Sequence, residues 1–191
     1  GMIKAADDAF VPSCSLERVV GTVILANTSG ADLSYNFTTF SGEVAVQRAA
    51  ADDVLVHYRW DASAAADVDL PGLAGRLLDD LAPRDRIVKP RSGKMDLIFA
   101  PEEVTTLLLP VVTCLNGAFV ADGSSALAGK IEQQVLDPRI TLIDDATLPR
   151  ALGSFPFDGE GVPGTRRPLI AKGVLRSYVT DLDAASRLGT S

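Results

Sequence analysis

Apolar and polar residues alternate along the first third of the chain, which is the pattern of strands that turn one face toward a core. The first apolar run, Val19–Leu25, is rich in β-branched residues, and turn residues such as Asn27 and Gly30 separate it from the next run. The pattern predicts an antiparallel meander of about four strands over residues 19–60. The strand-like runs are Val19–Leu25, Leu33–Thr38, Glu43–Arg48 and Val54–Trp60.

Helical periodicity begins after the meander. Leu73, Leu77 and Leu81 recur on one side of a helix predicted over Leu70–Ala82, which Pro83 ends. The rest of the chain predicts shorter elements. They are a strand at Met95–Phe99, a helix at Ser124–Val135, a strand at Ile140–Ile143, a hairpin of Arg167–Ala171 with Val174–Val179, and a last helix, Asp181–Leu188, capped by Thr180 and Gly189.

A further helix is predicted over Pro101–Gly117. Pro101 suits its first turn, Glu102 complements the positive end of the helix dipole, and Gly117 suits its C-terminal end. Pro110 lies in the middle, where it has no N–H for the Thr106 carbonyl, so we expect a kink there.

The order of these elements predicts an α+β fold, because strands precede helices instead of alternating with them. We expect an antiparallel sheet meander with helices packed against it, a long Gly/Pro loop at Leu148–Thr165, and a C-terminal hairpin with a short helix. Residues 2–191 are expected to form a single module, with the meander at 19–60 and the helical and hairpin part at 70–189.

Charge and composition narrow the function. The formal net charge of −7 disfavours binding to nucleic-acid phosphates, and the basic residues do not gather in a long run. No apolar run reaches the roughly 20 residues that cross a bilayer. Cys14 and Cys114 leave a single disulfide open, but reduced thiols in the cytoplasm are the simpler expectation.

Three stretches of the chain carry a family resemblance. Phe157–Pro163 reads F-D-G-E-G-V-P, and a hairpin and a small-residue helix ending in Leu188-Gly189 follow it. Ile140–Asp145 and the helix Pro101–Gly117 precede it in the same order. Together these stretches resemble the TldD/PmbA peptidase family, whose members were once called modulators of DNA gyrase. Family members are longer, so we expect this chain to lack their N-terminal domain and the sheet-rich segment that follows.

The resemblance implies where a catalytic member would hold zinc. In the catalytic type, the helix that matches Pro101–Gly117 carries an H-E-x-x-x-H pattern, in which two histidines bind zinc and the glutamate is the general base. These three positions correspond here to Leu109, Pro110 and Cys114, of which only the cysteine could coordinate a metal. The third ligand of the catalytic type, a cysteine, belongs to the C-terminal segment that this chain is expected to lack.

Residue counts point in the same direction. A catalytic zinc usually takes three protein ligands, mostly from His, Cys and carboxylates. The chain has one histidine, His57, and two cysteines, Cys14 and Cys114. His57 alternates with Val56 and Tyr58 in a predicted strand, which indicates a partly exposed structural histidine, and Cys114 suits a small core position. No G-x-S-x-G context accompanies His57. We therefore predict no metal site and no cofactor.

The long loop is the predicted peptide-binding segment. Its glycines let another backbone approach closely, and its prolines keep it from forming its own ladder. A rigid structural connection is the alternative reading. The candidate residues are Gly153, Phe157, Asp158, Glu160, Gly161, Val162 and Pro163.

The resemblance implies a non-catalytic, metal-less subunit of a cytoplasmic peptidase complex that acts on unfolded peptides. A TldD-like zinc peptidase subunit would be the partner, and this chain would contribute part of the substrate cavity and the partner surface. The alternative is a stand-alone peptide-binding or scaffold module without proteolytic activity. An enzyme that uses unrelated residues is the third and least supported reading.

Overall fold

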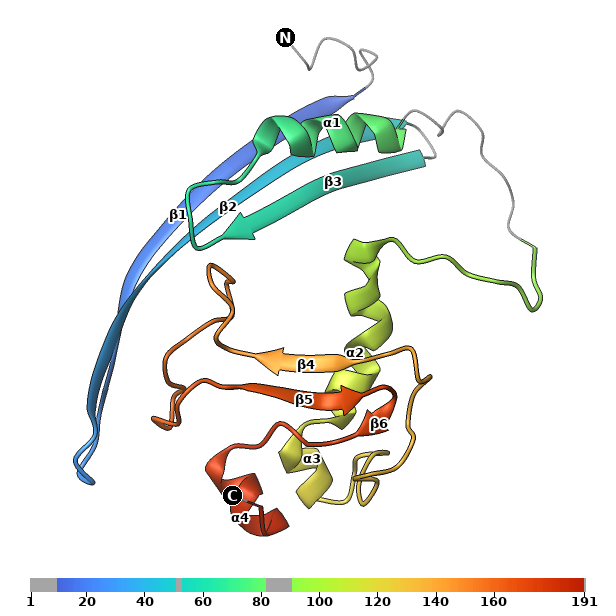
Figure 1. The fold of residues 1–191 in the computed structure, drawn as a ribbon. Coiled ribbons are helices and arrows are strands. Elements are labelled where there is room, and N and C mark those ends of the chain that lie inside the picture. Colours follow the sequence, from blue (N-terminus) through green and yellow to red (C-terminus); the bar gives the residue numbers. More distant parts are fainter. Residues whose placement is uncertain (1–9, 51–52, 82–90, 191) are drawn as a thin grey trace. The chain divides into compact units, whose positions relative to one another are not determined.

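The computed structural model describes residues 10–50, 53–81 and 91–190. Its backbone contacts form two compact units, one of residues 1–91 with 149–153 and one of residues 92–148 with 154–191. Each unit has one three-stranded antiparallel sheet; in the described residues, a single α-helix accompanies the sheet of the first unit and three α-helices accompany that of the second (Figure 1). The predicted α+β class is confirmed, whereas the prediction of a single module stays a prediction.

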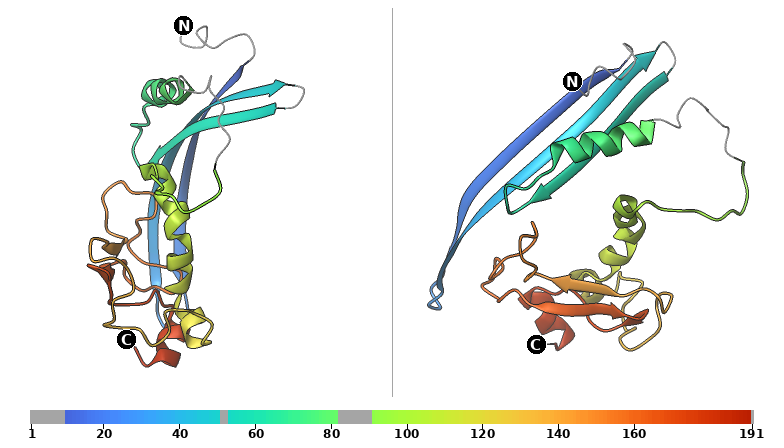
Figure 2. Two further views of the ribbon diagram at one scale, coloured as in Figure 1. Left: turned by 90° about the vertical axis from the view of Figure 1, so that its right-hand side faces the viewer. Right: turned by 45° about the horizontal axis from the view of Figure 1, so that its top comes forward.

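The first unit is a meander of three long strands, in the order β1-β2-β3. They are β1 (Val11–Ala26), β2 (Asp32–Ala50) and β3 (Asp53–Ser63). The β1–β2 ribbon continues past the end of β3, which pairs only with the second half of β2 (Figure 2). The Asn27 side chain organises the predicted turn by accepting from the N–H groups of Ser29 and Ala31 at 2.9 and 3.0 Å.

The prediction of about four strands is wrong, because two predicted runs join into the continuous strand β2. Gly42 lies between those runs, but it does not break the strand. A Cβ at this position would lie 2.7 Å from side-chain atoms of both Val68 and Leu70. The glycine therefore lets the segment before the helix pack directly on the sheet.

Helix α1 (Leu70–Leu81) covers one face of this sheet over β2 and β3. Leu73 and Leu77 are buried in the contact, as is Val46 of β2. The predicted helix is thus confirmed up to Leu81, and its predicted end at Ala82 and Pro83 lies outside the described residues.

The second unit is built around a small sheet of strands β4, β5 and β6. Its core consists of Leu115, Leu169, Ile170 and Leu175, with Val111 packed against it. The elements are the 3-10 turn η3 (Pro101–Glu103), α2 (Val104–Cys114), α3 (Gly117–Ala121), β4 (Leu142–Asp145), β5 (Arg166–Ala171), β6 (Val174–Leu175) and α4 (Leu182–Leu188). Within the described residues, none of the helices has the length and apolar character needed to cross a bilayer.

The helix predicted over Pro101–Gly117 divides into three elements. The α-helix continues on both sides of Pro110 and ends at Cys114. Gly117 starts α3 instead of ending α2, and the Asn116 side chain accepts from the Ala118 N–H to cap the new helix. A glycine is needed because a Cβ at residue 117 would lie 2.6 Å from the methyl group of Thr180.

The predicted helix Ser124–Val135 is wrong, because the segment forms turns instead. Gly129 and Glu132 have φ angles of 70° and 64°, which a right-handed helix does not allow. The backbone bonds elsewhere: the Glu132 N–H donates to Leu175 and the Val135 N–H donates to Gly173, at 2.9 and 2.8 Å. Pairing with the β5–β6 hairpin therefore replaces the helix.

The predicted strand Met95–Phe99 is also wrong. The segment belongs to no strand or helix, and Ile98 is almost fully exposed. A single apolar run cannot form a ladder alone, and this one has no pairing strand in the described part of the chain.

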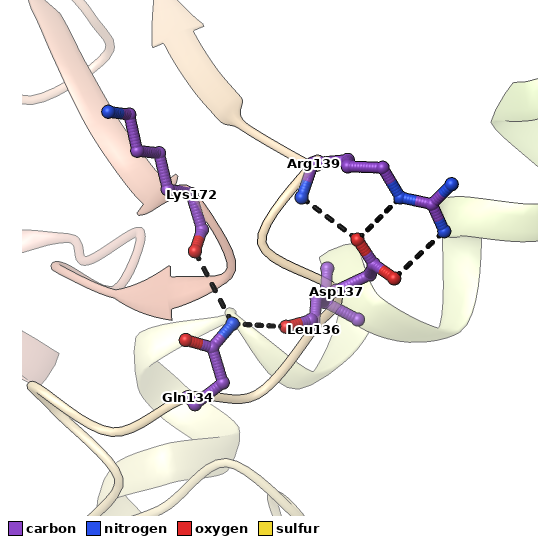
Figure 3. A network of polar contacts seen from close by, with 5 residues as sticks. All are labelled: Gln134, Leu136, Asp137, Arg139 and Lys172. Atoms are coloured by element: carbon purple, nitrogen blue, oxygen red, sulfur yellow. Dashed lines mark hydrogen bonds and ion pairs between the residues drawn. The ribbon is translucent and has the colours of Figure 1, made fainter.

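The predicted C-terminal hairpin is confirmed with a shorter second strand, and contacts to its turn hold it in place. The Gln134 side-chain amide donates to the carbonyls of Leu136 and, at 3.3 Å, Lys172 (Figure 3). Beside it, the N–H and guanidinium of Arg139 donate to the Asp137 carboxylate at 2.9 Å. These hydrogen bonds lower the pKa of Asp137 to about 2.

Helix α4 confirms the last predicted helix, with one correction at its start. The N-cap is Asp181, whose side chain accepts from the Ala184 N–H, and not Thr180 as predicted. Asp181 has extended backbone angles just before the helix, where a carboxylate can reach the first free N–H groups. Gly189 ends the helix with a φ of 67°, as predicted.

Candidate functional site

Helix α2 carries the three positions at which the resemblance predicts a lost zinc site. Leu109 is 58% exposed, Pro110 is exposed, and Cys114 is half-buried. The Thr113 hydroxyl also donates to the Leu109 carbonyl, one turn earlier in the helix, at 2.9 Å. Pro110 and Cys114 line an apolar cavity of about 180 Å³ together with Leu127. The cavity beside Pro110 and Cys114 therefore has a largely hydrocarbon lining.

Among the described residues, no group of three or more His, Cys, Asp or Glu side chains lies in a metal-binding arrangement. His57 belongs to the first unit, whereas α2 belongs to the second. Cys14 and Cys114 are both free cysteines in the structure, Cys14 exposed and Cys114 half-buried.

His57 has a structural environment. Its Nε2 lies 3.1 Å from a carboxylate oxygen of Asp80, and the Nε of Arg59 donates to the same oxygen at 2.7 Å. The side chains of His57 and Arg59 are each 21% exposed. These contacts join β3 to the last turn of α1, so His57 helps to attach the helix to the sheet.

The predicted binding loop is held by its own hydrogen bonds. The Asp158 carboxylate accepts from the N–H groups of Glu160 and Val162 at 2.9 Å, and the Asp158 N–H donates to the Val162 carbonyl. Gly161 has a φ of 85°, which the tight turn requires. Phe157 is buried and pairs with Pro163 across the base of the turn. These contacts close the segment Phe157–Pro163 into a turn.

Glu160 joins this loop to helix α4. Its carboxylate accepts from the N–H of Leu182, the first residue of the helix, at 2.9 Å. A negative group near the N-terminal end of a helix is stabilised by the free N–H groups and the helix dipole. The loop and α4 therefore form one connected structure.

A cavity of about 230 Å³ lies between this loop, the sheet and α4. Four of the predicted binding residues line it: Asp158, Glu160, Val162 and Pro163. Phe157 and Gly161 belong to the same turn without lining the cavity, and Gly153 belongs to the first unit. The structure thus brings part of the predicted set together around one hollow.

The other side of this cavity was not predicted. Asp144 of β4 and Arg167 of β5 line it and form an ion pair, with the Arg167 Nε 3.1 Å from the Asp144 carboxylate. Arg166 and Asp145, the next pair in register, also lie within ion-pair distance, at 3.2 Å. The sequence does contain a signal for these two ion pairs. The acidic dipeptide Asp144-Asp145 and the basic dipeptide Arg166-Arg167 lie at the ends of two predicted strands, where cross-strand pairing can bring opposite charges together.

The Asp145 carboxyl also organises the turn that follows β4. It accepts from the hydroxyl and N–H of Thr147 at 2.6 and 3.0 Å. These hydrogen bonds, chiefly the one from the hydroxyl, lower the pKa of Asp145, and the Arg166 charge adds to the effect. Asp145 therefore has a local structural role beside its cross-strand pairing.

Comparison with known protein families and proteins shows which of them this chain resembles. The sequence model of one protein family, described as the PmbA/TldA metallopeptidase C-terminal domain, matches residues 92–191. An uncharacterized protein of Methanocaldococcus jannaschii is 30% identical over 188 residues, which cover 98% of this chain and 44% of that protein.

Two crystal structures share the fold. A protein described as a modulator of DNA gyrase, from Bacteroides thetaiotaomicron, superposes with a TM-score of 0.87 at 24% identity, covering 100% of this chain and 46% of its own. TldE from Thermococcus kodakarensis gives a TM-score of 0.83 at 23% identity, covering 100% of this chain and 44% of its own. At these identities the likeness shows the fold alone, and this chain spans a little under half the length of these relatives. Because the family model covers more than half of the sequence, the chain belongs to the TldD/PmbA family.

Proposed function

We propose that this chain is a non-catalytic, metal-less subunit of a TldD/PmbA-type peptidase complex that acts on unfolded peptides. The observation that carries the proposal is the composition of α2 at the positions aligned with the zinc-binding pattern of the catalytic type. Leu109 has no lone pair, Pro110 has no carboxylate to activate water, and Cys114 lies against an apolar cavity.

The physical argument concerns both binding and catalysis. One thiol offers a single ligand, whereas a catalytic zinc needs about three protein ligands and an open position for water. Activation of that water further requires a base within hydrogen-bond reach, and a proline ring cannot accept a proton. Both steps of zinc-dependent hydrolysis are therefore unsupported at this helix.

In the proposed complex, a TldD-like subunit holds the zinc and cleaves the peptide. This chain contributes part of the substrate cavity through the loop around Asp158 and Glu160, which α4 holds in a fixed position. A pre-formed wall of this kind loses little conformational entropy when a peptide binds. We place the complex in the cytoplasm, where Cys14 and Cys114 remain reduced, and expect it to bind neither nucleic acid nor membranes.

Association with a TldD-like protein tests the proposal. The two proteins are mixed at micromolar concentration and analysed by size-exclusion chromatography with light scattering. We expect a peak with the mass of a defined complex of both chains. Separate elution of the two proteins would refute the subunit role and favour the stand-alone peptide-binding module.

A further inference from the structure

A second cavity in the second unit has a different chemistry from the one beside the loop. Its volume is about 400 Å³. Val120, Ile131 and Leu188 give it apolar walls, and Arg167 and Arg176 are also among its lining residues. An apolar hollow with a few charged groups at defined positions is the usual form of a small-ligand site.

Both arginines have carboxylate partners but keep further donors. The Arg167 Nε donates to Asp144 at 3.1 Å, and one terminal nitrogen of Arg176 pairs with Glu132. A guanidinium carries five N–H donors, and these two contacts use one nitrogen of each. Arg176 and Glu132 are 41% and 63% exposed, and an ion pair this accessible is weak enough for another carboxylate to compete with it.

The charge balance indicates the class of ligand. Because each arginine already has one carboxylate partner, the site has little net positive charge, and it would repel a doubly charged phosphate more strongly than a singly charged carboxylate. A single carboxylate needs only the remaining N–H donors, and a guanidinium can bind it through two parallel hydrogen bonds. The apolar walls would hold a hydrocarbon group attached to that carboxylate.

We propose that this cavity binds a carboxylate joined to a small apolar group, such as the C-terminal residue of a peptide. For peptide ligands, this inference rests on the proposed function. The cavity would then hold the C-terminal end of the substrate peptide. Free carboxylic acids of similar size share the same chemistry, and the experiment separates them from peptides.

The test is an NMR titration of the ¹⁵N-labelled chain with three probes. They are the peptide N-acetyl-Ala-Ala-Leu as the free acid, the same peptide as its C-terminal amide, and 4-methylpentanoate. We expect the amide signals around Arg176 to shift with the acid, and the amide peptide to bind about tenfold more weakly. Binding of 4-methylpentanoate as strong as that of the acid peptide would assign the site to free acids. Equal binding of the acid and amide peptides, or no binding of either, would overturn the proposal.

Three variants identify the residues responsible. Arg176→Gln should weaken binding of the acid peptide about tenfold, because the main donor is lost. Glu132→Gln should strengthen it, because the competing carboxylate is removed, and a folding defect would not give this gain. Arg139→Gln is the matched control, since Arg139 pairs with Asp137 and does not line the cavity. Unchanged affinity in both the Arg176→Gln and Glu132→Gln variants would contradict the proposal.

The test does not depend on zinc or on the partner. If the chain binds the acid peptide but does not associate with a TldD-like protein, the proposed function fails and this site remains. If it associates but does not distinguish acid from amide, the site fails and the subunit role remains.

Discussion

Gly173 is the residue whose identity the structure constrains most directly. It lies in the hairpin turn with a φ of 77°, and a Cβ there would overlap the Gln134 side chain and the carbonyl oxygens of Leu136 and Asp137. The Gly173 N–H donates to the Ile140 carbonyl. The Gly173 carbonyl accepts from the N–H groups of Val135 and Leu136. The turn therefore has room only for glycine.

Replacement of Gly173 by alanine should destabilise the second unit. Left-handed backbone strain and the clash with backbone carbonyls together should cost at least about 2 kcal/mol. Urea unfolding followed by circular dichroism measures the change in the free energy of unfolding.

Gly159→Ala is the matched control for this measurement. A Cβ at Gly159 meets nothing within 4 Å, and its φ is not in the left-handed region. We expect a change of less than about 0.5 kcal/mol. A similar loss in both variants would show that the contacts around Gly173 are not the cause.

At the level of elements, the first turn of α4 depends on two carboxylates, Asp181 and Glu160. Asp181→Ala removes the side chain that accepts from the Ala184 N–H. The loss of an N-cap should reduce the free energy of unfolding by about 1 kcal/mol. Asp181→Asn keeps the capping oxygen and should retain most of the stability, so equal losses in both variants would argue against the cap.

The attachment of α1 to β3 should depend on pH. Burial raises the pKa of the Asp80 carboxyl, but hydrogen bonds from His57 and Arg59 lower it by more, so that the pKa lies below the ordinary value of 3.8. A carboxyl with a lowered pKa in the folded state stabilises the fold above its unfolded pKa. That stabilisation is lost as the pH falls through the folded pKa.

Asp80→Asn should therefore destabilise the protein at pH 7 and have little effect near pH 2. Because water reaches the pair, the loss at pH 7 should be about 1 kcal/mol at most. Urea unfolding at the two pH values measures it, and Asp79→Asn, on the exposed side of the helix, is the control. An equal loss at both pH values would rule out the charge of Asp80 as the cause.

The elements that the sequence predicted correctly are those with strong local patterns. Leucine spacing marks α1, and Gly189 marks the end of α4, because both signals depend on near neighbours in the chain. The segment Ser124–Val135 has apolar residues that suit a helix, but its backbone bonds to a hairpin about 40 residues later in the chain. Such long-range pairing leaves no local signal, and it overrides a weak helical preference.

At the scale of the whole molecule, the sequence predicted one side of the candidate site better than the other. The loop that contains Phe157–Pro163 was predicted to bind a peptide because of its glycines and prolines, and four of its predicted residues line a cavity. That they bind a peptide stays a prediction. The residues opposite, Asp144, Arg167 and Asp181, come from three other elements. Their meeting depends on the register of β4 with β5 and on the position of α4, which spacing along the chain does not determine.

The cavity at Arg167 and Arg176 was missed for the same reason. Arg166-Arg167 is too short to form a basic run in the sequence, and Arg176 belongs to no motif. Only the folded unit places Arg167 and Arg176 beside the apolar residues of α3 and α4.

The zinc content of the complex with a TldD-like partner tests the central claim most directly. Elemental analysis of the purified complex should find zinc only in proportion to the partner, and Cys114→Ala in this chain should change neither the zinc content nor the hydrolysis of an unfolded peptide. Zinc bound in proportion to this chain and lost in the Cys114→Ala variant, together with chelator-sensitive hydrolysis by the chain alone, would contradict the account.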